Sequence, residues 1–101
     1  FDRDKLARGI ASAVAGRPID DEAVETIAVE IEDYLRESGP EVTTEMVGLA
    51  VLEQLKGLDD VAYLRFASVY KGFTDLADFE REVGLLQKTT APKPRRARDQ
   101  D

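Results

Sequence analysis

The cationic side chains near the start of the chain are the first candidates for binding chemistry. Arg3, Lys5 and Arg8 fall within the first two turns of a predicted helix that begins after Asp2. Cations there oppose the partly positive end of the helix dipole, and the first main-chain amides of a helix lack partners within it. Together these groups are typical of a phosphate site. Local ion pairing of the cations with Asp2 and Asp4 explains the same spacing, and on spacing alone it is the simpler explanation.

Residues suited to enzyme catalysis are few. The chain has no His and no Cys, which excludes imidazole catalysis, thiol chemistry, disulfides and the usual zinc ligand sets from it. Ser68 with Lys71 is the one Ser–Lys pairing in easy helical reach, and nothing marks it as a nucleophile and its base. There is no phosphate loop, dinucleotide fingerprint or calcium loop, and the carboxylates of the second predicted helix lie on its solvated face. We therefore expect a protein that is not an enzyme.

The sequence predicts a mainly α protein with five helical segments. Apolar residues recur at helical spacing almost throughout, and neither period-2 alternation nor a hairpin signal indicates a strand. Gly and Pro separate the segments, and Asp2, Asp20 and Thr43 are typical N-caps. The predicted helices span residues 3–15, 21–38, 44–56, 60–71 and 75–88. Short connections favour packing of successive helices as neighbours.

Apolar stripes indicate which faces of these helices form the core. The fourth helix carries Tyr63, Phe66 and Tyr70, a pattern that favours a core face over a base-stacking platform. The second helix carries the cleanest stripe, which contains Val24, Ile27, Ala28, Ile31, Tyr34 and Leu35. Gly9 and Gly48 lie inside helices, where Gly costs about 1 kcal/mol relative to Ala, so we expect a neighbour to approach closely at both.

Charge is distributed unevenly along the chain. The net charge is −7 over 101 residues, and residues 89–101 carry four cations against two carboxylates. Residues 1–88 therefore carry −9, which repels the phosphate backbone of nucleic acids. The composition of 89–101 favours a disordered basic tail. The longest nearly apolar run covers residues 47–52, whereas a bilayer needs ~20 apolar residues, so we expect a cytoplasmic protein with no membrane partner.

Two stretches of the chain resemble a known family. Residues 1–10 (FDRDKLARGI) resemble the first helix of an ATP-cone, a small nucleotide-binding regulatory domain. Residues 58–70 (LDDVAYLRFASVY) are more specific, and they resemble the ATP-cone of the NrdR family of bacterial transcriptional repressors, which control ribonucleotide reductase genes. The likeness covers roughly residues 1–86.

The resemblance implies a bundle of four to five helices capped by a small β-sheet lid, with the ATP-cone at residues 1–88. The family senses the balance of ATP and dATP, which Mg²⁺ can accompany, and changes its homo-oligomeric state. That change controls DNA binding by an N-terminal zinc ribbon. The ribbon and the leading strand of the lid are missing here, and the first residue is not Met. We therefore expect a fragment whose parent protein binds zinc and DNA.

The resemblance also implies which side chains contact the nucleotide. Lys5 matches a phosphate-contacting lysine of the family, and Asp2 matches the polar residue before the first helix. The other matches are Phe1 in the adenine pocket, Thr43 at the start of the third helix, Val47 on that helix, and Tyr70 and Lys71 at the end of the fourth.

Two alternatives stay open. The ATP-cone of a ribonucleotide reductase large subunit would make the parent an enzyme, although the resemblance implies a His in such cones where this chain has Val47. A plain helical interaction domain would bind no ligand. Nucleotide binding separates the second alternative from the sensor.

Overall fold

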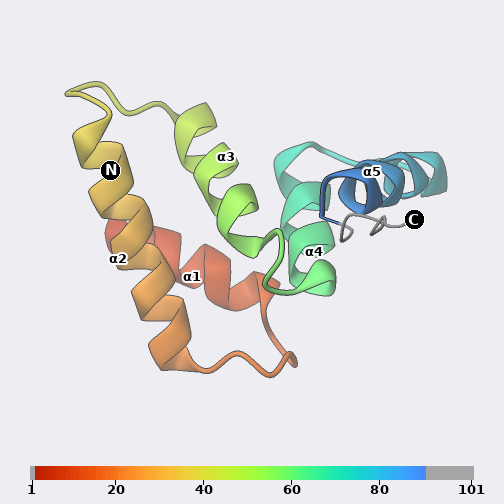
Figure 1. The fold of residues 1–101 in the computed structure, drawn as a ribbon, viewed down its shortest axis with the longest axis horizontal. Helices are drawn as coiled ribbons and strands as arrows, with labels where there is room; N and C mark the ends of the chain where they lie inside the picture. The colour runs from red at the N-terminus through yellow and green to blue at the C-terminus, as the bar shows by residue number, and fades with distance from the viewer. Residues whose placement is uncertain (1, 91–101) are drawn as a thin grey trace, which may run out of the picture.

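The computed structural model describes residues 2–90, with side chains described for residues 2–88. Five α-helices make up most of this part of the chain, and none of these residues forms a strand. The helices are α1 (Arg3–Ala13), α2 (Asp21–Glu37), α3 (Thr44–Leu55), α4 (Asp60–Tyr70) and α5 (Leu76–Thr90) (Figure 1). The predicted mainly α bundle is confirmed, and the expected β lid has no counterpart within residues 2–90.

Capping chemistry places the observed helix ends within two residues of the predicted ones. The Asp20 carboxylate accepts a hydrogen bond from the Ala23 amide at 2.8 Å and begins α2. The Thr43 hydroxyl accepts one from the Met46 amide at 3.1 Å and begins α3. Gly39, which follows the end of α2, has a φ of 124°, a conformation that L side chains rarely adopt. The sequence signals for starting and stopping these helices are therefore realised locally.

The first four helices supply nearly all of the core, to which α5 adds Leu86, and α5 lies on one side of them. α1 packs against α2 and α4, and α3 packs against the same two helices. α5 packs against α4 and stands beyond the other three helices (Figure 1). It continues to Thr90, two residues past its predicted end. The rest of the predicted basic tail, from residue 91 onward, lies outside the described residues.

The core consists of the predicted apolar stripes. One predicted residue of α2 is exposed instead, and the stripe on α5 is only partly buried. Its largest fully buried side chains are Ile10, Ile31, Leu35, Val51 and Leu55. The prediction that Tyr34 belongs to this core is wrong, since Tyr34 is 61% exposed beside a groove between α2 and α3. On α5, Leu86 is buried, whereas Leu76 is 71% exposed.

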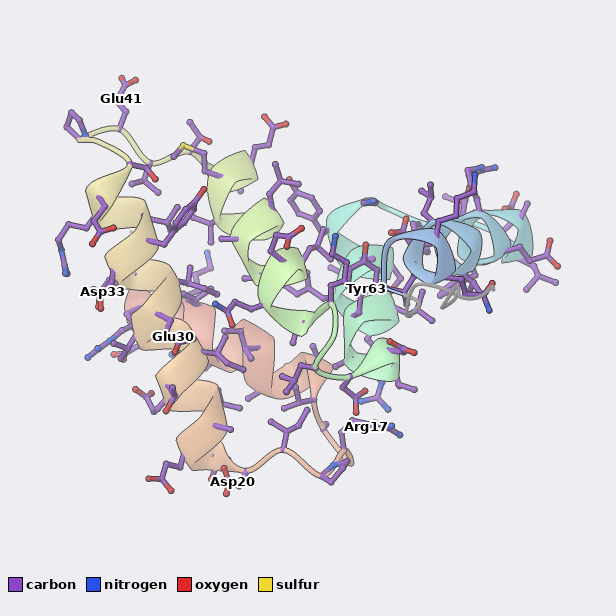
Figure 2. All side chains as sticks on the ribbon, viewed as in Figure 1. Arg17, Asp20, Glu30, Asp33, Glu41 and Tyr63 are labelled. Carbon is purple, nitrogen blue, oxygen red and sulfur yellow. The ribbon has the colours of Figure 1, made fainter. Side chains whose placement is uncertain are left out.

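A buried carboxylate joins α5 to α4. Glu82 of α5 is only 4% exposed, and it accepts hydrogen bonds from the Tyr63 hydroxyl at 2.7 Å and the Lys71 ammonium at 3.1 Å. Tyr63 lies on the side of α4 that faces α5 (Figure 2). Burial, reinforced by the hydrogen bond to Glu82, raises the pKa of Tyr63 to about 12. Sequence reasoning missed this contact because its members lie on different helices.

Two arginines join the end of α1 to α4. Arg65 donates to the carbonyl oxygen of Ala13 at 3.2 Å, close to the end of α1. Arg17 places its Nε 2.9 Å from a carboxylate oxygen of Asp59, the N-cap of α4 (Figure 2). The Ala62 amide, together with Arg17, holds the pKa of Asp59 below its usual value against the opposing effect of burial. These contacts fix the start of α4 relative to α1.

Candidate functional site

A groove of about 320 Å³ lies where the start of α1, the first half of α3 and the end of α4 meet. Its floor is apolar, and its few polar groups come from α1, α3 and Tyr70 of α4. The lining residues are Asp2, Lys5, Leu6, Gly9, Thr44, Val47, Gly48, Val51, Phe66 and Tyr70. Three segments that are distant in sequence therefore contribute to a single site.

The groove brings together four of the side chains predicted to contact a nucleotide: Asp2, Lys5, Val47 and Tyr70. Thr43 does not line it but caps α3, and the next residue, Thr44, takes a place in the lining. Phe1 lies outside the described residues.

Lys71 lies outside this lining, although it follows Tyr70 directly. Its ammonium is 3.1 Å from one carboxylate oxygen of Glu82 and 3.2 Å from the other. Helical geometry explains the separation, because consecutive residues point about 100° apart around a helix axis. Tyr70 therefore faces the groove, whereas Lys71 faces α5.

The cation on the edge of the groove is Lys5, whose side chain is exposed. Among the described residues, no carboxylate lies within ion-pairing distance of Lys5 or Arg8, whereas Arg3 reaches Glu32 at 3.5 Å. Local pairing of the α1 cations with Asp2 and Asp4 is therefore not observed.

The first main-chain amides of α1 are less available than the sequence suggests. One carboxylate oxygen of Asp2 accepts hydrogen bonds from the amides of Asp4 at 2.9 Å and Lys5 at 3.2 Å. The cap thus places a negative charge at the positive end of the helix, which stabilises α1. The expectation that unpaired main-chain donors contribute here is wrong for these two amides, so the Lys5 ammonium is the main attraction for an anion.

The close approach expected at Gly48 is confirmed, and the neighbour is Tyr70. A Cβ atom at Gly48 would lie 2.0 Å from Cε1 of the Tyr70 ring, which no real side chain tolerates. The Tyr70 hydroxyl donates to the carbonyl oxygen of Glu45 at 3.2 Å, and its ring stacks on Phe66 at a centroid distance of 6.1 Å. The missing Cβ therefore allows α4 to set an aromatic wall against α3.

Gly9 differs from Gly48, since no heavy atom lies within 4 Å of the position its Cβ would take. The close neighbour expected there is absent from the described part of the chain. Gly9 lines the groove, so a side chain at this position would extend into open space there. A glycine inside a predicted helix indicates that space is needed beside the helix. It does not indicate whether a neighbouring side chain fills that space, as at Gly48, or whether the space is part of a groove, as at Gly9.

The lining combines an apolar surface with the cation of Lys5, which suits the binding of a small molecule. Leu6, Val47 and Val51 with the ring of Phe66 form a surface for a flat apolar group, and Lys5 supplies a positive charge at the edge. Within residues 2–90 there is no cluster of three or more Asp or Glu residues suited to a metal ion. No helix in that range is long and apolar enough to span a membrane.

Comparison with known proteins shows that most of this chain is similar in sequence to a described domain family and to named proteins. The family described as the ATP cone domain matches residues 1–76. The Transcriptional repressor NrdR of Mycobacteroides abscessus is 50% identical over 88 residues, which cover 86% of this chain and 57% of that protein. The same-named proteins of Nocardia farcinica and Acidothermus cellulolyticus are 49% and 54% identical over 92 residues, which cover 90% of this chain and 59% and 54% of theirs. The chain thus spans little more than half the length of these relatives.

Proposed function

Because this chain belongs to the ATP-cone domain family, we propose that it is the ATP- and dATP-sensing regulatory domain of a transcriptional repressor. The observation that carries this proposal is the convergence of Asp2, Lys5, Val47 and Tyr70 on one groove within the matched region. The similarity to repressors named NrdR supports a regulatory domain over an enzyme domain.

The groove suits the adenine portion of the nucleotide. Its volume of about 320 Å³ is enough for a base with part of its sugar, and its walls are mostly aliphatic and aromatic. Gly9 leaves open space in which a planar ring could lie beside Val47. An adenine ring gains from such surfaces because burial of apolar area contributes about 25 cal/mol per Å².

The phosphates fit best over the first turn of α1. Lys5 has no carboxylate partner among the described residues, so its ammonium can face an anion without giving up an existing ion pair. Asp2 stands next to it with a negative charge, so a phosphate chain must keep clear of that carboxylate or approach it with Mg²⁺ between them.

Regulation by two such similar ligands requires differential binding. ATP and dATP differ at the 2′-hydroxyl group, and a ligand shifts a conformational equilibrium only by binding one state more tightly. We propose that the two nucleotides favour different homo-oligomers. DNA binding in this proposal belongs to a zinc ribbon outside this chain.

Titration calorimetry on the full-length protein tests the nucleotide site. ATP and dATP should both bind, and Lys5→Ala should weaken each by more than tenfold, or about 1.4 kcal/mol, because the main cation is lost. Its melting temperature should change little, since exposed charges contribute little to stability. Lys88→Ala, which removes an exposed cation outside the groove, is the matched control. Absence of heat for both nucleotides would refute the sensor, and equal affinities in Lys5→Ala would refute the phosphate role.

The same titration decides the role of Lys71. If Glu82 is the only important partner of Lys71, Lys71→Met should lower the free energy of unfolding by about 1–2 kcal/mol and leave nucleotide affinity within twofold. The loss of stability is smaller than for a fully buried ion pair because Lys71 is partly exposed to solvent. A tenfold loss of affinity would instead support the phosphate contact that the family resemblance implies.

A further inference from the structure

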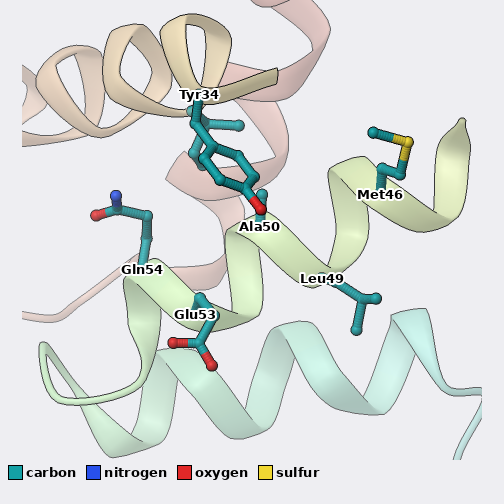
Figure 3. Close-up of a pocket in the computed structure, with 7 residues that line it drawn as sticks. Tyr34, Met46, Leu49, Ala50, Glu53 and Gln54 are labelled. Atoms are coloured by element: carbon teal, nitrogen blue, oxygen red, sulfur yellow. The ribbon is translucent and has the colours of Figure 1, made fainter. Parts of the chain in front are cut away.

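A second groove, of about 520 Å³, lies between α2 and α3 and shares no residue with the first. Figure 3 shows the Tyr34 ring over Ala50, with Met46 at one end of the groove and Gln54 at the other. The residues between Met46 and Gln54 rise by about 12 Å along α3, a little over two helical turns. The groove is therefore long enough to hold a segment of secondary structure.

The groove exposes large apolar side chains that a bundle of this kind would ordinarily bury. Tyr34 is 61% exposed and Leu49 is 51% exposed, and both line the groove together with Met46. Single exposed apolar residues are common on protein surfaces, but a contiguous set around a concave site marks a contact surface. The apolar floor, which includes Ile31, thus continues outward onto both walls.

Acidic residues flank the apolar wall on both helices. On α2, Glu30 and Glu37 lie four residues before and three residues after Tyr34, on the same side of the helix. On α3, Glu45 and Glu53 lie four residues before and after Leu49. All four glutamates are exposed. Lys56 pairs with Glu53 at 3.0 Å, whereas among the described side chains no cation lies within ion-pairing distance of the other three glutamates.

We propose that the groove between α2 and α3 docks an amphipathic helix of a partner protein, with apolar residues on its inner stripe and Lys or Arg on both flanks. A helix laid along two others buries its apolar stripe in their groove, and its basic flanks would meet the acidic walls. The charges also exclude other occupants. Nucleic acid would be repelled, and the same acidic face on a second copy of this chain would repel this one. The basic segment 91–101 lacks a large apolar residue to fill the floor.

A model peptide tests this chemistry directly. The probe is a helical peptide of about five turns with Leu at helical core spacing and Lys elsewhere, titrated into the full chain with ATP present throughout. Amide shifts should change along α2 and α3, and Leu49→Ser should weaken binding at least fivefold. Leu76→Ser is the matched control, because Leu76 is more exposed than Leu49 but lies on α5. It should leave the affinity within twofold.

Four results would overturn the proposal. The first is amide shift changes confined to α5 or to the groove lined by Lys5. The second is equal binding of a peptide with Glu in place of Lys, which would remove the charge argument. The third is an unchanged affinity in Leu49→Ser. The fourth is self-association, measured by sedimentation without peptide, that disappears in Leu49→Ser, because the occupant would then be a second copy of this chain. ATP binding is measured in the same samples, so failure of the peptide is separable from failure of the nucleotide site.

Discussion

The contact between Gly48 and Tyr70 makes a quantitative prediction about the substitution Gly48→Ala. The new methyl group would lie 2.0 Å from Cε1, 2.5 Å from Cδ1 and 2.6 Å from Cζ of the Tyr70 ring. Carbon atoms pack best at about 3.5–4.0 Å, so the ring would have to retreat by about 1.5–2 Å. That movement would break its hydrogen bond to the Glu45 carbonyl and disturb its stacking on Phe66.

Two opposing effects set the size of the change. Overpacking costs about 1–3 kcal/mol, and three clashing ring atoms place this case in the upper half of that range. Replacing Gly by Ala inside a helix returns about 1 kcal/mol of helix propensity. We therefore expect Gly48→Ala to lower the free energy of unfolding by about 1–2 kcal/mol, which corresponds to a fall in melting temperature of at least about 4 °C.

A double-mutant cycle separates the two effects. In a Tyr70→Ala background the ring is gone, so Gly48→Ala should raise the free energy of unfolding by about 1 kcal/mol, the helix-propensity gain alone. The coupling energy between the two sites should thus reach about 2–3 kcal/mol, well above the ~0.5 kcal/mol expected for independent sites. Urea unfolding followed by far-UV circular dichroism measures all four proteins. Stabilisation by Gly48→Ala in the parent background would refute the close packing of α4 on α3.

Two further predictions concern titrating contacts, and both are read from urea midpoints measured across a pH series. The pKa of Tyr63 is raised from 10.0 to about 12, so its contribution to stability is complete below pH 10 and is lost as the pH rises toward 12. Tyr63→Phe should remove that loss of stability at alkaline pH. It should also lower the free energy of unfolding at neutral pH by about 1–2 kcal/mol, because Glu82 loses a hydrogen-bond donor. The pKa of Asp59 is held below 3.8, so its contribution to stability is present above pH 3.8 and is lost as the pH falls through the lowered pKa. Asp59→Asn still caps α4 and should reduce this loss of stability at acid pH. If the free energy of unfolding falls equally steeply with decreasing pH in the variant, the contacts of Asp59 with Ala62 and Arg17 stabilise little.

Local signals in the sequence account for the helices almost completely. The caps at Asp2, Asp20 and Thr43 and the breaks at Gly39 and Gly72 act over three or four residues, so their effect can be worked out without knowing the fold. Burial is also predicted wherever an apolar stripe meets another helix. The prediction that Tyr34 is buried is wrong because the spacing of apolar residues on α2 does not indicate where α3 lies. α3 leaves a groove beside Tyr34.

The candidate site depends more strongly on tertiary structure. Resemblance to a family selected Asp2, Lys5, Val47 and Tyr70, and the fold gathers them. Periodicity alone could not have done so, because whether Lys5 pairs with a neighbouring carboxylate depends on side-chain placement. The same limit applies to Lys71, whose partner Glu82 lies on another helix and becomes visible only when α5 is placed against α4.

The position of the groove also explains how an acidic domain could hold a triphosphate. Residues 1–88 carry −9, yet charges farther than a Debye length of about 8 Å are largely screened at physiological ionic strength. Groups close to the groove therefore determine the electrostatic potential that a bound triphosphate experiences. The groove lies beside the positive ends of α1 and α3, with the Lys5 ammonium at its edge. The Asp2 carboxylate and the negative end of α4 are the unfavourable local elements, and Lys71, the C-cap of α4, offsets that end while it pairs with Glu82. The two lysines thus act at opposite ends of helices, since Lys5 lies in the first turn of α1 and Lys71 caps the end of α4.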